Sequence, residues 1–119
     1  MGPEKKLWHE LKRNTPQIKC TRLENTSLLG TPDLLGYTNS GKFFTVELKV
    51  TKSNKVRFSP HQIAFHIRHP KNTFILVKSL GQSDLKLFQG TKIMELVACG
   101  FKLDPCSLGL ESIIKTLEA

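Results

Sequence analysis

Two carboxylates and a lysine stand close together in the stretch Gly30–Lys49. Asp33 follows a proline, thirteen residues lie between Asp33 and Glu47, and Lys49 follows Glu47 after a single residue. Carboxylate oxygens are the ligands that Mg²⁺ prefers, and a neighbouring cation can offset the charge of a phosphate. If the chain brings these three side chains together, they could hold a magnesium ion beside a phosphate group that is to be cleaved.

The local elements favour such a meeting. Phe43–Val50 is apolar and β-branched, which predicts a strand buried in a sheet. Side chains alternate between the faces of a strand, so Glu47 and Lys49 share the face opposite the apolar residues. Leu34–Tyr37 predicts a second short strand, and the turn signal at 39–41 predicts a hairpin that returns Asp33 to Glu47.

A Glu-x-Lys pair on a strand is more often a solvated face or an edge that resists aggregation. Here the Pro-Asp step, the hairpin and the apolar flanks together favour a site. Burial of a carboxylate in an apolar strand costs free energy unless a partner compensates for it. Asp33 and Lys49 would meet Glu47 at one point, where a magnesium ion could bind.

Length and charge limit the class of protein. A chain of 119 residues predicts a single domain covering 1–119, and a net charge of +8 predicts a polyanionic partner, most simply nucleic acid. A membrane surface is the alternative, but no basic amphipathic helix is evident. Without a long apolar run or a signal-peptide pattern, we expect a soluble cytoplasmic protein without membrane association. Cys20, Cys99 and Cys106 are expected to be buried or half-buried thiols, without a disulfide or zinc site.

The remaining chain predicts an α/β fold with a mixed central β-sheet flanked by helices. The expected helices cover 3–14, 60–69, 91–99 and 110–117, with the third capped by Thr91 and ended by Gly100. The expected strands cover 18–24, 34–37, 43–50, 73–78 and 85–88, with 73–78 central and 85–88 at an edge.

The first helix offers two acidic residues. Its apolar stripe of Leu7, Trp8 and Leu11 predicts that Glu4 projects from the inner face and that Glu10 is more exposed. Glu4 could be a further ligand or could simply favour the helix dipole at a frayed first turn. Glu24, at the expected end of a strand, is another candidate ligand.

A basic loop follows the strand that carries the acid, with Lys52, Lys55 and Arg57 close to Lys49. We expect this loop to follow a DNA backbone without reading bases, because neither a recognition helix nor an aromatic stacking platform is evident.

The helix after the basic loop begins with a capping signal. Ser59 is the expected N-cap, and Gln62 would complete a capping box or contact a phosphate or water, two roles that are compatible. Ser59 and His61 are expected to contact DNA. Ile63, Ala64 and Ile67 are expected to face inward, while His61, His66 and His69 are expected to be surface or phosphate-contacting residues rather than metal ligands.

The element order α-β-β-β-α-β with Pro32-Asp33 and Glu47-Leu48-Lys49 resembles the PD-(D/E)XK nuclease superfamily. GTPDLLG resembles the phage and VRR-type members, and VELKVTK with a basic loop resembles archaeal Holliday-junction resolvases. The resemblance covers most of residues 4–88 and implies a restriction-endonuclease-like core.

The resemblance also implies a set of roles. Asp33, Glu47, the Leu48 carbonyl and Glu4 would bind Mg²⁺, for which Mn²⁺ could substitute. Lys49 would position the attacking water or offset charge on the phosphate, Gln62 would match a polar residue of the following helix, and the products would carry 5′-phosphates. The expected location is the nucleoid or the cytoplasm of a phage-infected host.

Three functions remain open. The first is a dimeric endonuclease that resolves branched DNA, because paired cuts across a junction need two sites related by a twofold axis. The second is a monomeric VRR-type nuclease that nicks DNA or trims flaps and ends. The third is a non-catalytic nucleic-acid binder, which an intact acid pair disfavours.

Overall fold

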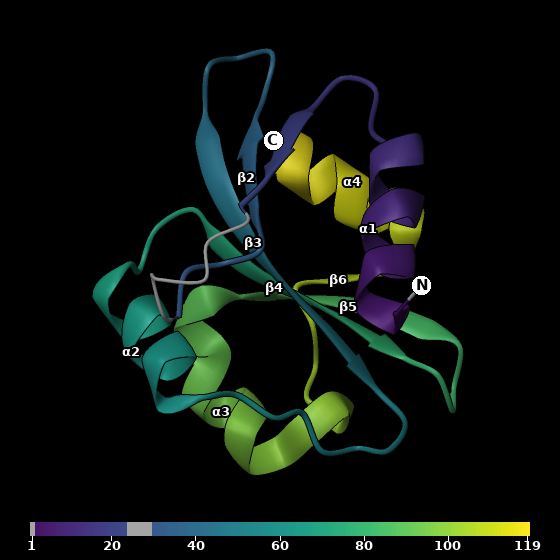
Figure 1. Cartoon of the computed structure of the whole chain (residues 1–119), viewed down its shortest axis with the longest axis vertical. Coiled ribbons are helices and arrows are strands. Elements are labelled where there is room, and N and C mark those ends of the chain that lie inside the picture. The colour runs from purple at the N-terminus through teal and green to yellow at the C-terminus, as the bar shows by residue number, and fades with distance from the viewer. Residues whose placement is uncertain (1, 24–29) are drawn as a thin grey trace.

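A computed structural model describes residues 2–23 and 30–119 of the chain, so Glu24 lies outside the described residues (Figure 1). Within that part, four α-helices accompany six strands. The helices are α1 (Pro3–Arg13), α2 (Pro60–Arg68), α3 (Ile93–Cys99) and α4 (Leu110–Glu118). The strands are β1 (Lys19–Arg22), β2 (Leu34–Tyr37), β3 (Phe43–Thr51), β4 (Thr73–Ser79), β5 (Asp84–Gln89) and β6 (Ser107–Leu108).

The six strands form one mixed sheet in the order β1-β2-β3-β4-β5-β6. The pair β3–β4 is parallel and is connected through α2, whereas the other neighbouring strands are antiparallel. A parallel pair needs such a crossover, because its strands must start at the same end of the sheet. The α/β class, the mixed sheet and the central position of β4 are confirmed.

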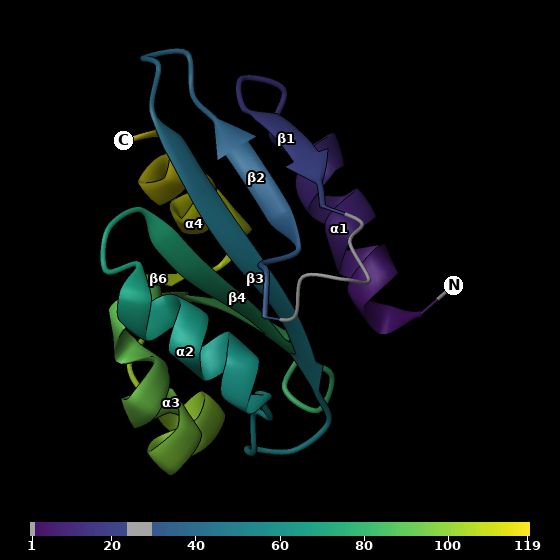
Figure 2. The ribbon, with the colours of Figure 1, turned by 60° about the vertical axis from the view of Figure 1, so that its left-hand side comes forward.

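Helices cover both faces of the sheet, with α1 and α4 on one face and α2 and α3 on the other (Figure 2). On the first face, Val46 and Leu48 of β3 are fully or almost fully buried against the α1 stripe of Leu7, Trp8 and Leu11. The alternation along β3 therefore directs Glu47 and Lys49 toward the α2 side, as the sequence predicts.

Three predictions about the later elements are wrong. Strand β5 is interior, because the two-residue strand β6 pairs with it at Lys86 and Leu87. A short 3₁₀ turn, Gly90–Lys92, precedes α3, and Thr91 does not cap it. Cys106 is exposed, whereas Cys20 and Cys99 are half-buried as expected.

The predicted inner face of helix α2 is confirmed at Ile63, which packs against the core, and is wrong at Ile67. Ile67 is 60% exposed, and His66 instead lies fully buried beside Gly90 and Thr73. Burial, together with the nearby His69, lowers the pKa of His66 to about 4. The ring is therefore neutral near pH 7, and the prediction of a surface histidine holds for His61 and His69 but not for His66.

Within residues 2–23 and 30–119, no helix is long and apolar enough to cross a membrane.

Candidate active site

The β2–β3 hairpin brings Asp33 and Glu47 together. Leu34 pairs with Val46, so Asp33, the residue before Leu34, comes opposite Glu47. Asp33 is held there by its own side chain, because its Oδ2 accepts a hydrogen bond of 2.8 Å from the backbone N–H of Leu48. Glu47 is 2% exposed, so the acid pair has one member almost entirely out of solvent.

The pair is electrostatically unfavourable as it stands. Burial raises the pKa of Glu47 to about 9, the charge of Asp33 adds to the rise, and Lys49 opposes it. Glu47 Oε1 is buried and receives no hydrogen bond from the described residues. Two neighbouring carboxylates repel each other when both are charged. The pair therefore binds either a proton or a cation, which offsets this repulsion.

Gln62 links the acid to the lysine. Its Nε2 donates to Glu47 Oε2 at 3.3 Å, and its Oε1 accepts from Lys49 Nζ at 3.1 Å. The same Oε1 accepts from the Ser59 N–H at 3.0 Å, while Ser59 Oγ accepts from the Gln62 N–H at 3.1 Å. The capping box is therefore confirmed. It holds Gln62 in place, and Gln62 in turn orients the side chains of Glu47 and Lys49.

Lys49 is positioned from a second side by an aromatic ring. Its Nζ lies 5.0 Å from the ring centroid of Phe58, a favourable cation–π distance. The ammonium group is therefore held near Glu47 without forming a direct ion pair within 4.0 Å among the described residues.

The Leu48 carbonyl points to the same edge of β3 as its N–H, because both backbone groups of a strand residue face one side. That side is occupied by Asp33, and the β2–β3 ladder has already ended at Leu34 and Val46. The carbonyl is thus directed toward the acid pair, as a further oxygen ligand would be.

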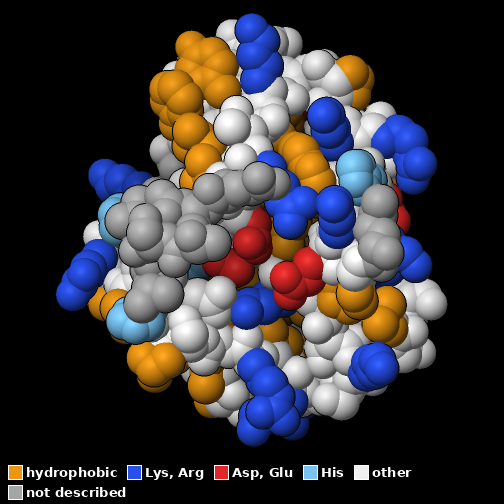
Figure 3. Space-filling model, in the orientation of Figure 1, with side chains coloured by type: hydrophobic (Ala, Val, Ile, Leu, Met, Phe, Trp, Pro, Cys, Tyr) orange, Lys and Arg blue, Asp and Glu red, His pale blue; other side chains and the backbone are white. Residues whose placement is uncertain are grey.

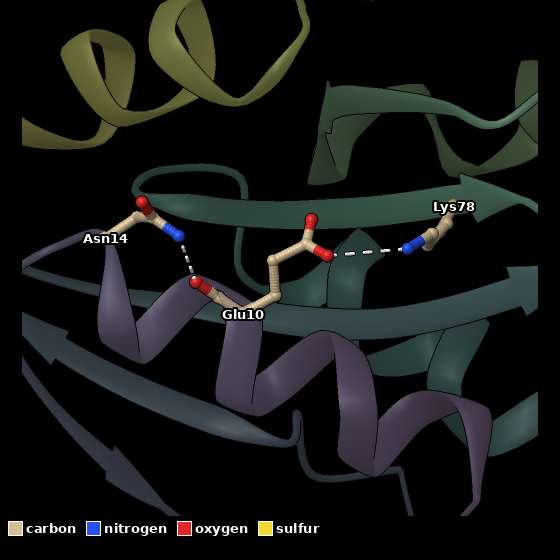
Figure 4. Close-up of polar contacts among 3 residues, drawn as sticks. All are labelled: Glu10, Asn14 and Lys78. Atoms are coloured by element: carbon tan, nitrogen blue, oxygen red, sulfur yellow. Dashed lines mark hydrogen bonds and ion pairs between the residues drawn. The ribbon is translucent and has the colours of Figure 1, made fainter.

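The two acids of α1 have different partners. Glu10 forms an ion pair with Lys78 at 3.4 Å, and its backbone carbonyl accepts from Asn14 (Figure 4). Glu4 faces the site: desolvation of its carboxyl group raises its pKa, Asp33 adds to the rise, and Lys49 opposes it. The expected exposures are wrong, because Glu4 is exposed and Glu10 is half-buried. Glu4 lies on the first turn of α1, whereas Glu10 packs beside Lys78.

Substitution of these two acids should separate their roles. Glu4→Gln is expected to lower metal-dependent cleavage of DNA about tenfold, because it removes a charge that acts on Asp33 and Glu47. Glu10→Gln should leave cleavage within about twofold, since it affects only a surface ion pair. The measurement is the single-turnover cleavage rate of the two variants in parallel. Equal, undiminished rates would mean that α1 contributes nothing to the site.

The donor set fits a magnesium ion in part. Among residues 2–23 and 30–119, no three His, Cys, Asp or Glu side chains converge closely enough to hold a metal, and Glu4 stays a predicted ligand. Mg²⁺ commonly takes one or two carboxylates and fills its other positions with water and phosphate oxygens. The unpartnered Glu47 Oε1 and the Leu48 carbonyl complete a set of that kind.

A hollow of about 400 Å³ lies next to Lys49, and neither Asp33 nor Glu47 lines it. Its charged lining consists of Glu4, Lys49, Lys52, Lys55 and Arg57. Figure 3 shows acidic side chains near the middle of the molecule in this view, with lysine and arginine side chains around them. The three cations of the basic loop are exposed, so they can reach a polyanion without losing internal partners.

Asn54, which the sequence analysis did not single out, fixes the shape of this loop. Its Nδ2 donates to the Cys99 carbonyl, its Oδ1 accepts from the Lys102 N–H, and its own carbonyl accepts from Phe101. The loop is thus tied to the end of α3. An Asn within a polar loop carries no local signal for a contact that lies 45 positions away.

Comparison of the sequence with models of protein families gives no match, and comparison with curated proteins gives none either.

Proposed function

We propose that this chain is a Mg²⁺-dependent endodeoxyribonuclease of the PD-(D/E)XK type that hydrolyses phosphodiester bonds in DNA. One observation carries the proposal: Glu47 is buried beside Asp33, next to Lys49, and one of its oxygens has no hydrogen-bond donor among residues 2–23 and 30–119. This arrangement is unfavourable by itself and becomes favourable when a cation binds. The arrangement of these residues and the element order support the assignment.

Each residue of the site has a role in this proposal. A bound Mg²⁺ would polarise a phosphate oxygen and lower the pKa of a water molecule. Asp33 and Glu47 would supply the negative charge that holds the ion, and the Leu48 carbonyl would add a neutral oxygen. Lys49 would stabilise the additional charge that develops on the phosphate as water attacks. Gln62 would hold the side chains of Lys49 and Glu47 in position through its hydrogen bonds to each.

A purely structural or binding role explains the acid pair poorly. A carboxyl group whose pKa lies at about 9 has lost the favourable hydration of its charged form. Neither its neutral form nor its charged form attracts a polyanion. A DNA binder without catalysis would keep the basic loop and would be more stable with an apolar residue at position 47. The binder therefore remains the weaker alternative.

The DNA structure that the protein would prefer depends on its oligomeric state. A symmetric dimer would present two sites to a four-way junction, which suits resolution of Holliday junctions. A monomer would suit nicking or the trimming of flaps and ends, as in VRR-type nucleases. Mn²⁺ would be expected to replace Mg²⁺ in either case, since both accept oxygen ligands.

The proposal can be tested with matched four-way junction, flap and linear duplex substrates of the same sequence. Incubation with Mg²⁺ should give cleavage that EDTA prevents, and a mass measurement of the protein in solution should accompany it. Paired cuts by a dimer would identify a resolvase, and single cuts by a monomer would identify a trimming nuclease. If every substrate remains intact with Mg²⁺ and with Mn²⁺, the nuclease proposal is wrong.

The basic loop gives a prediction about DNA binding. Lys52→Ala with Lys55→Ala should weaken binding to all sequences alike and reduce the slope of log K against log salt by about two, because each phosphate contact contributes about 0.9. The measurement is a salt titration of DNA affinity in EDTA.

A matched control is Lys92→Ala with Lys115→Ala, which removes the same charge from the exposed surfaces of the 3₁₀ turn before α3 and of α4. That variant should keep the wild-type slope. If both double variants reduce the slope equally, the overall charge of the protein, and not the loop, attracts the DNA.

A further inference from the structure

Tyr37 and Phe43 form an exposed aromatic pair on the β2–β3 hairpin. The two residues are cross-strand partners, their ring centroids lie 4.5 Å apart, and their planes meet at 48°. Tyr37 is 38% exposed and Phe43 is 57% exposed, so neither ring hides the other from solvent. Figure 3 shows hydrophobic side chains gathered over the hairpin, in the same view as the carboxylates. The sequence by itself gives no sign of an aromatic stacking platform, and the hairpin brings two exposed rings together.

This pair lies on the same face of the sheet as the candidate active site. Residues two apart in a strand share a face, so Phe43, Thr45 and Glu47 form one line along β3. Four residues at about 3.3 Å each place Phe43 about 13 Å from Glu47 along the strand. That length corresponds to about four stacked nucleotides at 3.4 Å per nucleotide.

A cation stands beside the rings. Lys19 of β1 pairs with Tyr37, which pairs in turn with Phe43, so all three side chains form one row on this face. Lys19 is exposed and has no ion pair among the described residues. Two exposed rings next to an exposed ammonium group are complementary to a base and its phosphate.

We propose that Tyr37 and Phe43 bind unpaired nucleotides by stacking on their bases, while Lys19 contacts the adjoining phosphate. The inference rests on the proposed function only in taking DNA as the partner. Aromatic side chains bind single strands in this way because every base has an exposed π face, which a paired base in a duplex does not offer. The substrate would then carry a single-stranded segment a few nucleotides from the bond that is cut.

An aromatic cross-strand pair can also serve only to stabilise its hairpin. The two roles differ in which ligands they affect and in which substitutions they tolerate. Stabilisation of the hairpin acts equally on all ligands, whereas stacking affects single strands alone and survives exchange of one aromatic ring for another. Variants that remove the rings or exchange them therefore separate the two roles.

The test measures DNA binding in EDTA, by fluorescence anisotropy of a labelled 20-nucleotide single strand and of a matched blunt duplex. Tyr37→Ala with Phe43→Ala should lower affinity for the single strand about tenfold to a hundredfold and change affinity for the duplex less than about twofold. Tyr37→Phe with Phe43→Tyr should retain wild-type affinity. Ile67→Ala with Met94→Ala removes exposed apolar side chains from α2 and α3 and should have no effect.

A second measurement locates the contact directly. A single strand that carries 5-iodouracil should form a photochemical crosslink to Tyr37 or Phe43, found by mass spectrometry of the digested protein. Tyr37 is the only tyrosine of the chain, so a crosslinked tyrosine identifies its position.

Three outcomes would overturn the inference: unchanged single-strand affinity in the double alanine variant, an equal loss of duplex affinity, or a wild-type dimer that the variant dissociates. Because binding is measured without divalent ions, the result does not depend on cleavage. Selective loss of single-strand binding with no cleavage by any variant would support the aromatic site and reject the nuclease. Cleavage by the wild type, together with unchanged single-strand affinity in the double alanine variant, would support the nuclease and reject the aromatic site.

Discussion

Replacing Glu47 with Gln should lower the rate of Mg²⁺-dependent DNA cleavage at least about a hundredfold, and Asp33→Asn should do the same. Both changes keep the size of the side chain and remove one of the two charges that would hold the ion. The rate is measured under single-turnover conditions with saturating protein. Glu95→Gln, the same change on the exposed surface of α3, is the matched control and should cleave at the wild-type rate.

The stability of the metal-free protein gives a second readout for Glu47→Gln. The pKa of Glu47 is raised from 4.5 to about 9, so between these pH values the unfolded chain releases a proton that the folded chain keeps. The free energy of unfolding of the wild type in EDTA should therefore fall as the pH rises through this window. Glu47→Gln lacks this loss and should be the more stable protein at pH 8.

Magnesium should reverse that order. Because the ion binds the charged form, Mg²⁺ should raise the melting temperature of the wild type, more strongly at pH 8 than at pH 6. Glu47→Gln should show a much smaller rise. An equal rise in the wild type and in Glu47→Gln would place the ion elsewhere on the protein.

Lys49→Met should reduce cleavage about a hundredfold to a thousandfold, since it removes the cation that would oppose the developing charge on the phosphate. Methionine retains an unbranched apolar stem that can pack on Phe58. The change acts on the chemical step and not on the ion, so Mg²⁺ should still raise the melting temperature. The measurements are the single-turnover rate and the thermal stability with and without Mg²⁺.

The Lys49 variant also separates catalysis from DNA binding. A single exposed lysine of the loop, replaced as Lys55→Met, should change affinity but leave the rate at saturating protein near that of the wild type. If Lys49→Met and Lys55→Met lower the saturated rate equally, Lys49 has no special role at the phosphate.

Much of the site could be predicted from the sequence because its spacing is local. The two-residue period of a strand places Glu47 and Lys49 on one face, and the turn at 39–41 returns the chain so that Asp33 meets Glu47. The capping box at Ser59 and Gln62 is likewise a pattern of four consecutive residues. These interactions depend on backbone geometry that few residues determine.

The contacts that the sequence did not reveal depend on packing between distant elements. Which side of α2 faces the sheet is decided by the crossover from β3 to β4, and a rotation of about 100° exchanges His66 for Ile67. Strand β6 has two residues, too few for any periodic signal. Tyr37 and Phe43 meet only because the hairpin register makes them partners, and a shift by one residue would part them.

The most direct test of the central claim is cleavage of one internally labelled branched DNA by wild-type protein and by Glu47→Gln, each with Mg²⁺ and with EDTA. The two proteins are purified in parallel, so that a contaminating nuclease would act in both preparations. We predict that only the wild type with Mg²⁺ cleaves, and that its products carry a 5′-phosphate and a 3′-hydroxyl. Cleavage of equal rate in both proteins, or no Mg²⁺-dependent cleavage by the wild type, would contradict the assignment of Asp33 and Glu47 as a metal-dependent nuclease site.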